Sequence, residues 1–228
     1  MKHIGIVGCS AEGAALCYRT ICSEAARLTG SHEHPEITMH TPSLALYVDR
    51  LERGDWAGVG ELMLASADKL AAAGADFLIC PDNTIHQALP LIVERSPTPW
   101  LHIAEVVADA ARARSYKRIG IMGTRWLVAS DIYPNALASR DMTAVTPSSG
   151  DADLMNRIIM DELVPSIVRT ESVRALEAVI DRLRDAGCDA VVLGCTELPL
   201  VLGPANSTLP TLDSTRLLAI AALQRARA

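Results

Sequence analysis

The chain has 228 residues and a formal net charge of −6 at pH 7, and half of its residues are hydrophobic while only 4% are aromatic. The negative charge gives no electrostatic reason to expect a nucleic acid or an anionic membrane as a partner. No apolar run of about 18 residues predicts a membrane span. The first residues lead directly into an apolar stretch and leave no room for a signal peptide, so we predict a cytoplasmic protein.

The first predicted element is a buried strand at the start of the chain. Residues 2–8 read KHIGIVG, and the same pattern returns 115 residues later as KRIGIMG in residues 117–123. Each is a short apolar run that ends in glycine, which is typical of a buried strand in a parallel sheet.

A second and longer repeat follows in chain order. Residues 62–84 match residues 175–197 at an offset of 113. Each copy predicts an amphipathic helix that ends at Ala-Gly, then an aspartate, then an apolar strand and a loop. Two matched blocks at nearly the same offset indicate an internal duplication.

The duplication predicts the architecture. We expect an α/β protein with two pseudo-symmetric, doubly wound lobes, each with a parallel sheet, and an active site in the cleft between the lobes. The N-terminal lobe is predicted over residues 1–97 plus 209–228, and the C-terminal lobe over residues 98–208. The last predicted helix, Ser214 to Ala228, is expected to return to the first lobe.

The repeat also predicts where the chemistry lies. Ligands of open parallel sheets bind beyond the carboxyl ends of the strands, and the offset of 113 aligns Asp82 with Cys195 in two such loops. A pseudo-two-fold axis would direct both side chains to one point from opposite sides. Stereoinversion requires this arrangement, because one group removes the Cα proton and the other delivers a proton to the far face. We therefore predict Asp82 and Cys195 as the catalytic residues.

Simpler interpretations of some residues stay open. Asp82 is alternatively a cap of the helix that follows, because Asp, Asn and Thr are all good N-cap residues. His86, one turn further on, is either a helix-surface residue or part of the site. Cys80 and Cys188 lie in or beside apolar stretches and are interpreted as small packing residues. Cys195 follows glycine in a loop where packing requires no thiol, which favours catalysis.

No metal site is predicted. The six cysteines and six histidines are scattered along the chain, and they form no CxxC pair and no spacing typical of zinc ligands.

Several motifs together resemble the aspartate/glutamate racemase superfamily over nearly the whole chain. GCTE at residues 194–197 resembles the second catalytic motif of the aspartate racemase branch, and DNTIH at residues 82–86 resembles its first motif, usually Cys-Asn-Thr-x-His. The opening IGIVGCSAEG resembles the family's Gly-Gly-Met opening. The segments RGDW, IGIMGTR, DELV and LDST-R also fit the family.

The resemblance implies a reaction without pyridoxal phosphate or another cofactor, in which two bases act on a small amino acid or related carboxylic acid. It also implies a homodimer. Carried over by motif, it implies that five polar residues line the substrate site and that Glu197 lies near the substrate amine. The five are Ser10, Asn83, Thr84, Thr124 and Thr196.

Three departures from the family pattern bear on the reaction. Asp82 replaces the first catalytic cysteine, and Cys9 stands where a second glycine is usual, which narrows the turn that faces the ligand. Pro165 occupies a place where aspartate racemases often carry a lysine for the side-chain carboxylate. Arg50 is a candidate to replace that cation, as are Arg53 and Arg125, although all three also fit solvent-exposed positions.

An Asp–Cys pair leaves more than one reaction open. Free Asp and Cys side chains titrate about 4.6 pH units apart, so the unperturbed pair rests with Asp82 ionised and Cys195 protonated. The leading hypothesis is an amino-acid racemase or epimerase. The alternative is a related isomerase, decarboxylase or lyase in which Cys195 is the single proton donor or acceptor. A third hypothesis, a non-catalytic binding module, is disfavoured by the intact GCTE motif.

Overall fold

The computed structural model describes residues 1–228. The chain forms two compact units, of which the first comprises Met1–Val106 with Thr215–Ala228 and the second comprises Val107–Ser214. Both are built from parallel strands and helices, and each contains one four-stranded sheet. The α/β class and the two-lobe fold with parallel sheets predicted from the duplication are confirmed.

The first unit alternates strands and helices in the manner of a doubly wound fold. Its elements are β1 (Ile4–Val7), α1 (Ala11–Thr29), β2 (Ile37–His40), α2 (Leu44–Glu52), α3 (Trp56–Ala72), β3 (Phe77–Ile79), the 3₁₀ helices η1 (Thr84–Leu91) and η2 (Val93–Arg95), β4 (Trp100–Leu101), the start of α4 (Ile103–Ala113) and nearly all of α9 (Ser214–Arg227).

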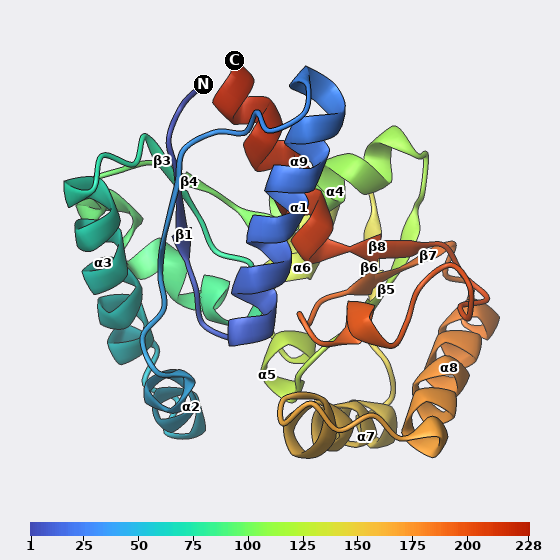
Figure 1. Ribbon diagram of the computed structural model, residues 1–228. Coiled ribbons are helices and arrows are strands. Elements are labelled where there is room, and N and C mark those ends of the chain that lie inside the picture. Colours follow the sequence, from blue (N-terminus) through green and yellow to red (C-terminus); the bar gives the residue numbers. More distant parts are fainter. The chain divides into compact units, whose positions relative to one another are not determined.

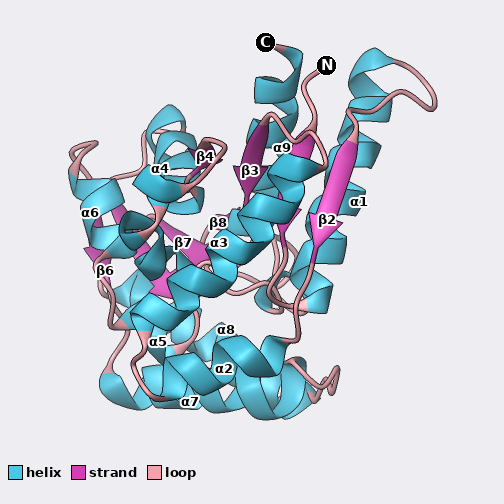
Figure 2. Cartoon of the chain, turned by 90° about the vertical axis from the view of Figure 1, so that its left-hand side faces the viewer, coloured by secondary structure: helices cyan, strands magenta, loops and turns pink.

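The sheet of the first unit has the strand order β2-β1-β3-β4, with all neighbours parallel. Helix α3 covers one face, as Figure 2 shows. The opposite face is covered by α1 and α9, whose residues Ile21 and Leu218 pack in one cluster with Ile4 and Ile79 of the sheet. The C-terminal helix therefore returns to the first unit. All residues of β1 are buried, because helices cover both faces of a parallel sheet.

The second unit repeats this plan. Its elements are most of α4, then β5 (Arg118–Met122), α5 (Arg125–Val128), α6 (Ile132–Ala138), β6 (Thr143–Val145), α7 (Ser149–Ile158), a π-helical turn η3 (Ile159–Leu163), α8 (Thr170–Asp185), β7 (Ala190–Leu193), the 3₁₀ helix η4 (Leu198–Leu200) and β8 (Thr211–Asp213).

The sheet of the second unit has the order β6-β5-β7-β8, again all parallel. Strand by strand it is the order of the first sheet, with β5 in the place of β1 and β7 in the place of β3. Helix α8 packs Leu176 and Ile180 in one apolar cluster with Val191 and Leu193 of β7, which Cys195 also joins.

The repeat is preserved at the level of single hydrogen bonds. Asp76 accepts a hydrogen bond from the backbone N–H of His3 at 2.6 Å, just before β1. Its counterpart Asp189 accepts from the backbone N–H groups of Lys117 and Arg118 at 2.7 and 3.2 Å, at the start of β5. In each unit the equivalent aspartate, which lies before β3 or β7, thus accepts a hydrogen bond from the backbone at the start of β1 or β5.

Both units also end the repeated helix in the same way. Gly74 follows α3 with φ of 92° and Gly187 follows α8 with φ of 85°, a left-handed conformation that favours glycine. The Ala-Gly pair that predicted a helix stop is therefore the real stop in both copies.

The limits of the two units differ from the residue boundaries drawn from the sequence, 97/98 and 208/209. Strand β4 pairs with β3 through Leu78 and Trp100, and this pairing places residues beyond 97 in the first unit. Strand β8 pairs with β7 through Val191 and Thr211, which places residues beyond 208 in the second. Each unit keeps its fourth strand, so both limits fall later in the chain.

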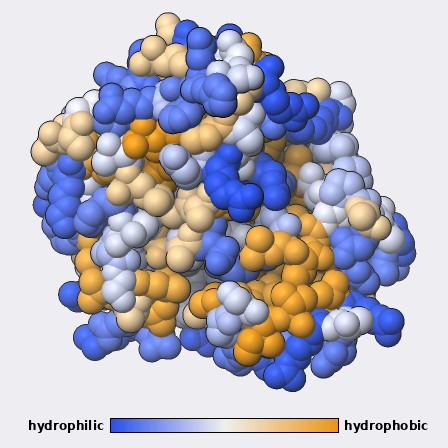
Figure 3. Space-filling model, viewed as in Figure 1, coloured by the Kyte–Doolittle hydropathy of each residue, from blue (hydrophilic) through white to orange (hydrophobic).

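The surface mixes polar and apolar side chains. Figure 3 shows hydrophobic patches between hydrophilic areas on the face that it draws. Large exposed hydrophobic residues include Met39, Val168 and Leu200, and scattered residues of this kind are normal on folded proteins. None of the helices is long and apolar enough to cross a membrane.

Candidate active site

The first predicted motif follows the carboxyl end of β3. Asn83 and Thr84 are buried with 1% and 6% of their surfaces exposed, whereas Asp82 is half-buried. Asn83 holds the N-cap position of η1 but makes no capping hydrogen bond through its side chain. Asp82 therefore precedes the cap position, at the tip of the loop between strand and helix.

The sequence left open whether His86 is a helix-surface residue or part of the site, and the structure shows that it is buried. Its ring is 1% exposed, and its Nε2 lies 3.0 Å from the backbone oxygen of Cys80. Cys80, the first residue after β3, is itself fully buried, and its thiol donates to the backbone oxygen of Asp82 at 3.8 Å. Burial and the nearby Asp82 raise the pKa of the Cys80 thiol, which fits a packing residue.

The second predicted motif follows β7, the strand equivalent to β3. The Cys195 thiol is 9% exposed and donates to Oε2 of Glu197 at 2.9 Å. The Thr196 hydroxyl donates to the same oxygen at 2.7 Å, and Glu197 is only 3% exposed. The three polar residues of the GCTE motif therefore form one connected group.

Gly194 is required by close packing rather than by an unusual backbone conformation. A Cβ atom at this position would lie 2.6 Å from Cδ2 of Leu127 and 2.8 Å from the backbone oxygen of Met122. The Gly194 N–H donates to that oxygen at 2.8 Å. The end of β7 thus lies directly against the end of β5, and this contact fixes the start of the loop that carries Cys195.

Two residues expected to bind substrate also hold helix N-termini. The Ser10 hydroxyl accepts from the backbone N–H of Gly13 at 3.2 Å and caps α1. The Thr124 hydroxyl accepts from the N–H of Leu127 at 3.3 Å and caps α5. Both are buried at the carboxyl end of the central strand of their sheet, β1 and β5 respectively. Substrate binding by Ser10 and Thr124 stays a prediction.

The remaining candidates are in different environments. Cys9 is 4% exposed and lies between β1 and Ser10. Arg50 pairs with Asp55 at 2.6 Å, and 44% of its side chain is exposed. Arg53 pairs with Asp49 in the same helix region, with 67% of its side chain exposed. Each of these two arginines thus pairs with a carboxylate of this chain.

Sequence reasoning did not single out Tyr47 of α2. Its side chain is fully buried. Burial raises the pKa of Tyr47 first, and the neighbouring Cys80, Cys9 and Asp82 raise it further. Tyr47 therefore lies close to the two predicted loops of the first unit. The LALYVDRL pattern does not indicate that Tyr47 lies near these loops, because an inward-facing tyrosine on an amphipathic helix is typical of an ordinary core residue.

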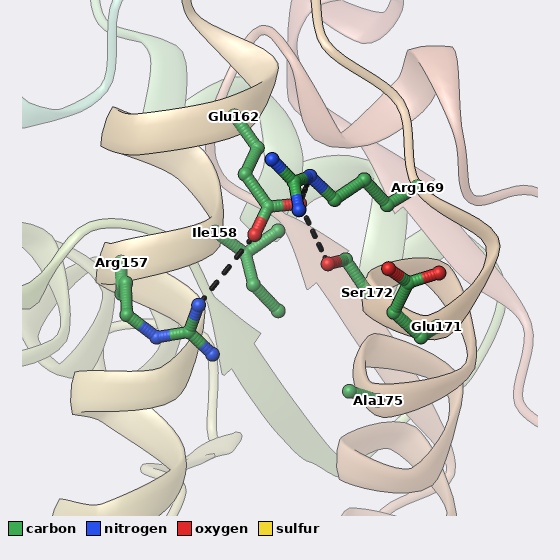
Figure 4. A pocket seen from close by; sticks show the side chains of 7 residues that line it. All are labelled: Arg157, Ile158, Glu162, Arg169, Glu171, Ser172 and Ala175. Carbon is green, nitrogen blue, oxygen red and sulfur yellow. Dashed lines mark hydrogen bonds and ion pairs between the residues drawn. The ribbon is translucent and has the colours of Figure 1, made fainter.

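The second unit also contains a polar pocket that includes none of the predicted site residues. It has a volume of about 200 Å³ and is lined from α7, η3 and α8. Figure 4 shows Glu162 at its centre. The Glu162 carboxylate accepts from the Ser172 hydroxyl at 2.6 Å and lies 3.5 and 3.8 Å from the guanidinium groups of Arg157 and Arg169. The bond to Ser172 connects the π-helical turn to α8, and the two arginines come from α7 and from the residue before α8, so we interpret the group as structural.

No cluster of three or more His, Cys, Asp and Glu side chains is arranged to hold a metal ion. The two predicted proton carriers, a carboxylate and a thiol, lie in equivalent loops of the two units, and each is followed by buried hydroxyl and amide or carboxyl groups. This fold and these loops define a duplicated α/β protein with one predicted acid/base residue after the third strand of each sheet.

The chain belongs to the Asp/Glu/hydantoin racemase family, whose model matches residues 4–222. A glutamate racemase from Beutenbergia cavernae is 31% identical over 152 residues, which are 64% of this chain and 50% of that protein. The chain thus matches about half the length of this relative. The broad-specificity amino-acid racemase RacX of Bacillus subtilis is 23% identical over 190 residues, 82% of this chain and 80% of that protein.

A solved structure is similar over the full length of both chains. It is a Yersinia pestis protein assigned as an Asp/Glu racemase, with a TM-score of 0.90 and 28% identity, and the match covers 100% of each chain. The similarity extends across both units, which confirms the family recognised from the motifs.

Proposed function

We propose that this protein is an amino-acid racemase or epimerase that needs neither metal nor pyridoxal phosphate and uses Asp82 and Cys195 as its two proton carriers. The family and its racemase relatives support an isomerase that acts on amino acids. The assignment of the two proton carriers is our own inference from this chain.

The observation that carries the proposal is the equivalence of the two loops. Asp82 follows β3 and Cys195 follows β7, and these strands take the same place in sheets of identical order. The buried thiol of Cys195 donates a hydrogen bond to Glu197, which supports a role as the resting proton donor. A half-buried Asp82 at the tip of its loop is a suitable resting base.

In the proposed reaction the Asp82 carboxylate removes the Cα proton from one face of the amino acid. The electron pair of the C–H bond passes to the substrate carboxylate, and Cys195 then delivers its proton to the opposite face. The product leaves Asp82 protonated and Cys195 ionised, and the reverse direction restores the pair. Asn83, Thr84 and Thr196 would stabilise the charge on the substrate carboxylate, since preorganised donors stabilise developing charge.

The proposal is tested by incubating single amino acids with the protein in deuterated water, in the presence of a chelator and without pyridoxal phosphate. We expect a deuteron to enter at Cα of both enantiomers while the carbon skeleton stays intact. Mass spectrometry and chiral chromatography measure the two quantities. Loss of carbon dioxide or ammonia, with one product only, would support the decarboxylase or lyase alternative instead. Activity that needs an added divalent ion would exclude the metal-free mechanism.

The finer expectations concern assembly and location. We infer a homodimer and a cytoplasmic protein, on the resemblance to dimeric family members and on the sequence composition. Light scattering is expected to give about twice the chain mass of 24.4 kDa. A mass equal to that of a single chain would contradict the dimer.

A further inference from the structure

His86 makes a hydrogen bond that closes the loop carrying Asp82. Its Nε2 lies 3.0 Å from the backbone oxygen of Cys80, the first residue after β3. The backbone N–H of His86 donates to the oxygen of Asn83 at 3.2 Å. Side chain and backbone of one residue therefore hold the loop before and after Asp82.

The geometry determines the tautomer of this histidine. A carbonyl oxygen can only accept, so Nε2 of His86 must carry the proton. Nδ1 is then a lone-pair acceptor, and this buried atom has no hydrogen-bond partner. A protonated ring would place a second N–H where no acceptor lies.

The neighbouring ring also keeps His86 neutral. His102, which follows β4, meets the His86 ring edge to face with centroids 4.6 Å apart. Burial first, and His102 second, lower the pKa of His86 to about 3. His86 is therefore uncharged at neutral pH and cannot serve as a general acid there.

We propose that His86 is a positioning residue that holds the Asp82 carboxylate in place through the Cys80 carbonyl, as a permanently neutral hydrogen-bond donor. The inference rests on the proposed function of Asp82 and deepens it. Without the imidazole, the backbone oxygen of Cys80 would lose the hydrogen bond from His86 just beyond the end of the pairing between β1 and β3. The strand side of the loop would then keep the hydrogen bond from the Cys80 thiol to the Asp82 backbone oxygen but lose the one from His86.

A purely structural role and a positioning role make different predictions. A structural residue changes stability, whereas a positioning residue changes the turnover of the folded enzyme. A misplacement of about 1 Å in a catalytic group can reduce the rate about 10²-fold. Two substitutions separate the hydrogen bond from the packing. His86→Phe keeps an aromatic ring against His102 but removes the donor, and His86→Gln keeps an N–H near the position of Nε2.

We expect His86→Phe to reduce kcat about 10²-fold with KM changed less than about threefold, and His86→Gln to recover kcat to within about tenfold of the wild type. Circular dichroism and thermal unfolding establish that both variants are folded. His34→Phe, at an exposed histidine outside the loop, is the matched control and should retain wild-type kinetics. Equal loss in the Phe and Gln variants, or full activity in the Phe variant, would overturn the proposal.

A second measurement does not depend on turnover. Nitrogen NMR of histidine-labelled protein should show His86 protonated at Nε2 only, at pH values on both sides of neutrality. The Asp82 carboxyl carbon should shift or broaden in His86→Phe and return towards its wild-type signal in His86→Gln. An Nδ1-protonated or titrating His86 would overturn the inference. If these signals behave as expected while the wild type racemises no amino acid, the proposed function fails and the positioning bond stands.

Discussion

Cys195→Ser is expected to lower racemase turnover by at least about 10²-fold, the lower range for loss of a positioned acid or base. The thiol is buried and donates to Glu197 at 2.9 Å, so a serine hydroxyl can occupy nearly the same place. It would still be a poor proton carrier, because an alkoxide forms far less readily than a thiolate at neutral pH. The measurement is kcat in both directions, with Cα deuterium exchange followed on each enantiomer.

Cys188→Ser is the matched control for this substitution. Cys188 is a buried thiol of the same unit, 5% exposed, and lies in the loop before β7 rather than in the loop after it. Its replacement should lower the unfolding temperature more than it lowers kcat. Near-normal turnover in Cys195→Ser would exclude Cys195 as a proton carrier.

Asp82→Asn is expected to lower turnover by about 10²-fold or more, because the amide keeps the shape of the carboxylate but cannot take up a proton. Asp82→Cys should retain or increase the two-way exchange of the Cα hydrogen. Two thiols titrate at similar pH, so moving the proton between them costs less than between a carboxylate and a thiol. Both variants are compared by deuterium incorporation at Cα from each enantiomer.

Asp68→Asn, on the exposed side of α3, makes the same chemical change away from the loop and should leave the exchange rates unaltered. Full activity of Asp82→Asn would make Asp82 a binding residue or a structural one. A single-thiol reaction through Cys195 would then explain the protein better than racemisation.

The duplication could be recognised in the sequence because equivalent residues of the two copies have the same structural role. Asp76 and Asp189 each accept backbone hydrogen bonds at the start of the first strand of their unit. Gly74 and Gly187 each take the left-handed conformation that ends a helix. Local requirements of this kind depend on residue type at a fixed spacing, so a single sequence reveals them.

The limits of the units were less accessible to sequence reasoning. Strands β4 and β8 have two and three residues, and each is defined by its pairing with a longer strand. Runs so short carry almost no periodicity. Their partner strands, β3 and β7, lie about 20 residues earlier in the chain, so each pairing exists only in the folded sheet.

The environment of single side chains was the least predictable part of the site. The motif around His86 fits a surface position one turn into a helix as well as a buried one. Its bond to Cys80 arises because the chain after β3 turns back on itself. Tyr47 was missed for a related reason, since nothing in its helix shows that its buried hydroxyl lies beside Cys9 and Asp82.

The sequence by itself determined the duplicated α/β fold, the family, and the two loops that carry Asp82 and Cys195. These follow from strand patterns, helix stops and motif residues, which act over a few neighbouring positions. The tertiary structure decided which polar groups are buried and how they pair: Cys195 with Glu197, and His86 with Cys80. Such pairs depend on burial, because removal from water makes each donor and acceptor require a partner, and that partner is chosen by the packing of elements distant in the chain.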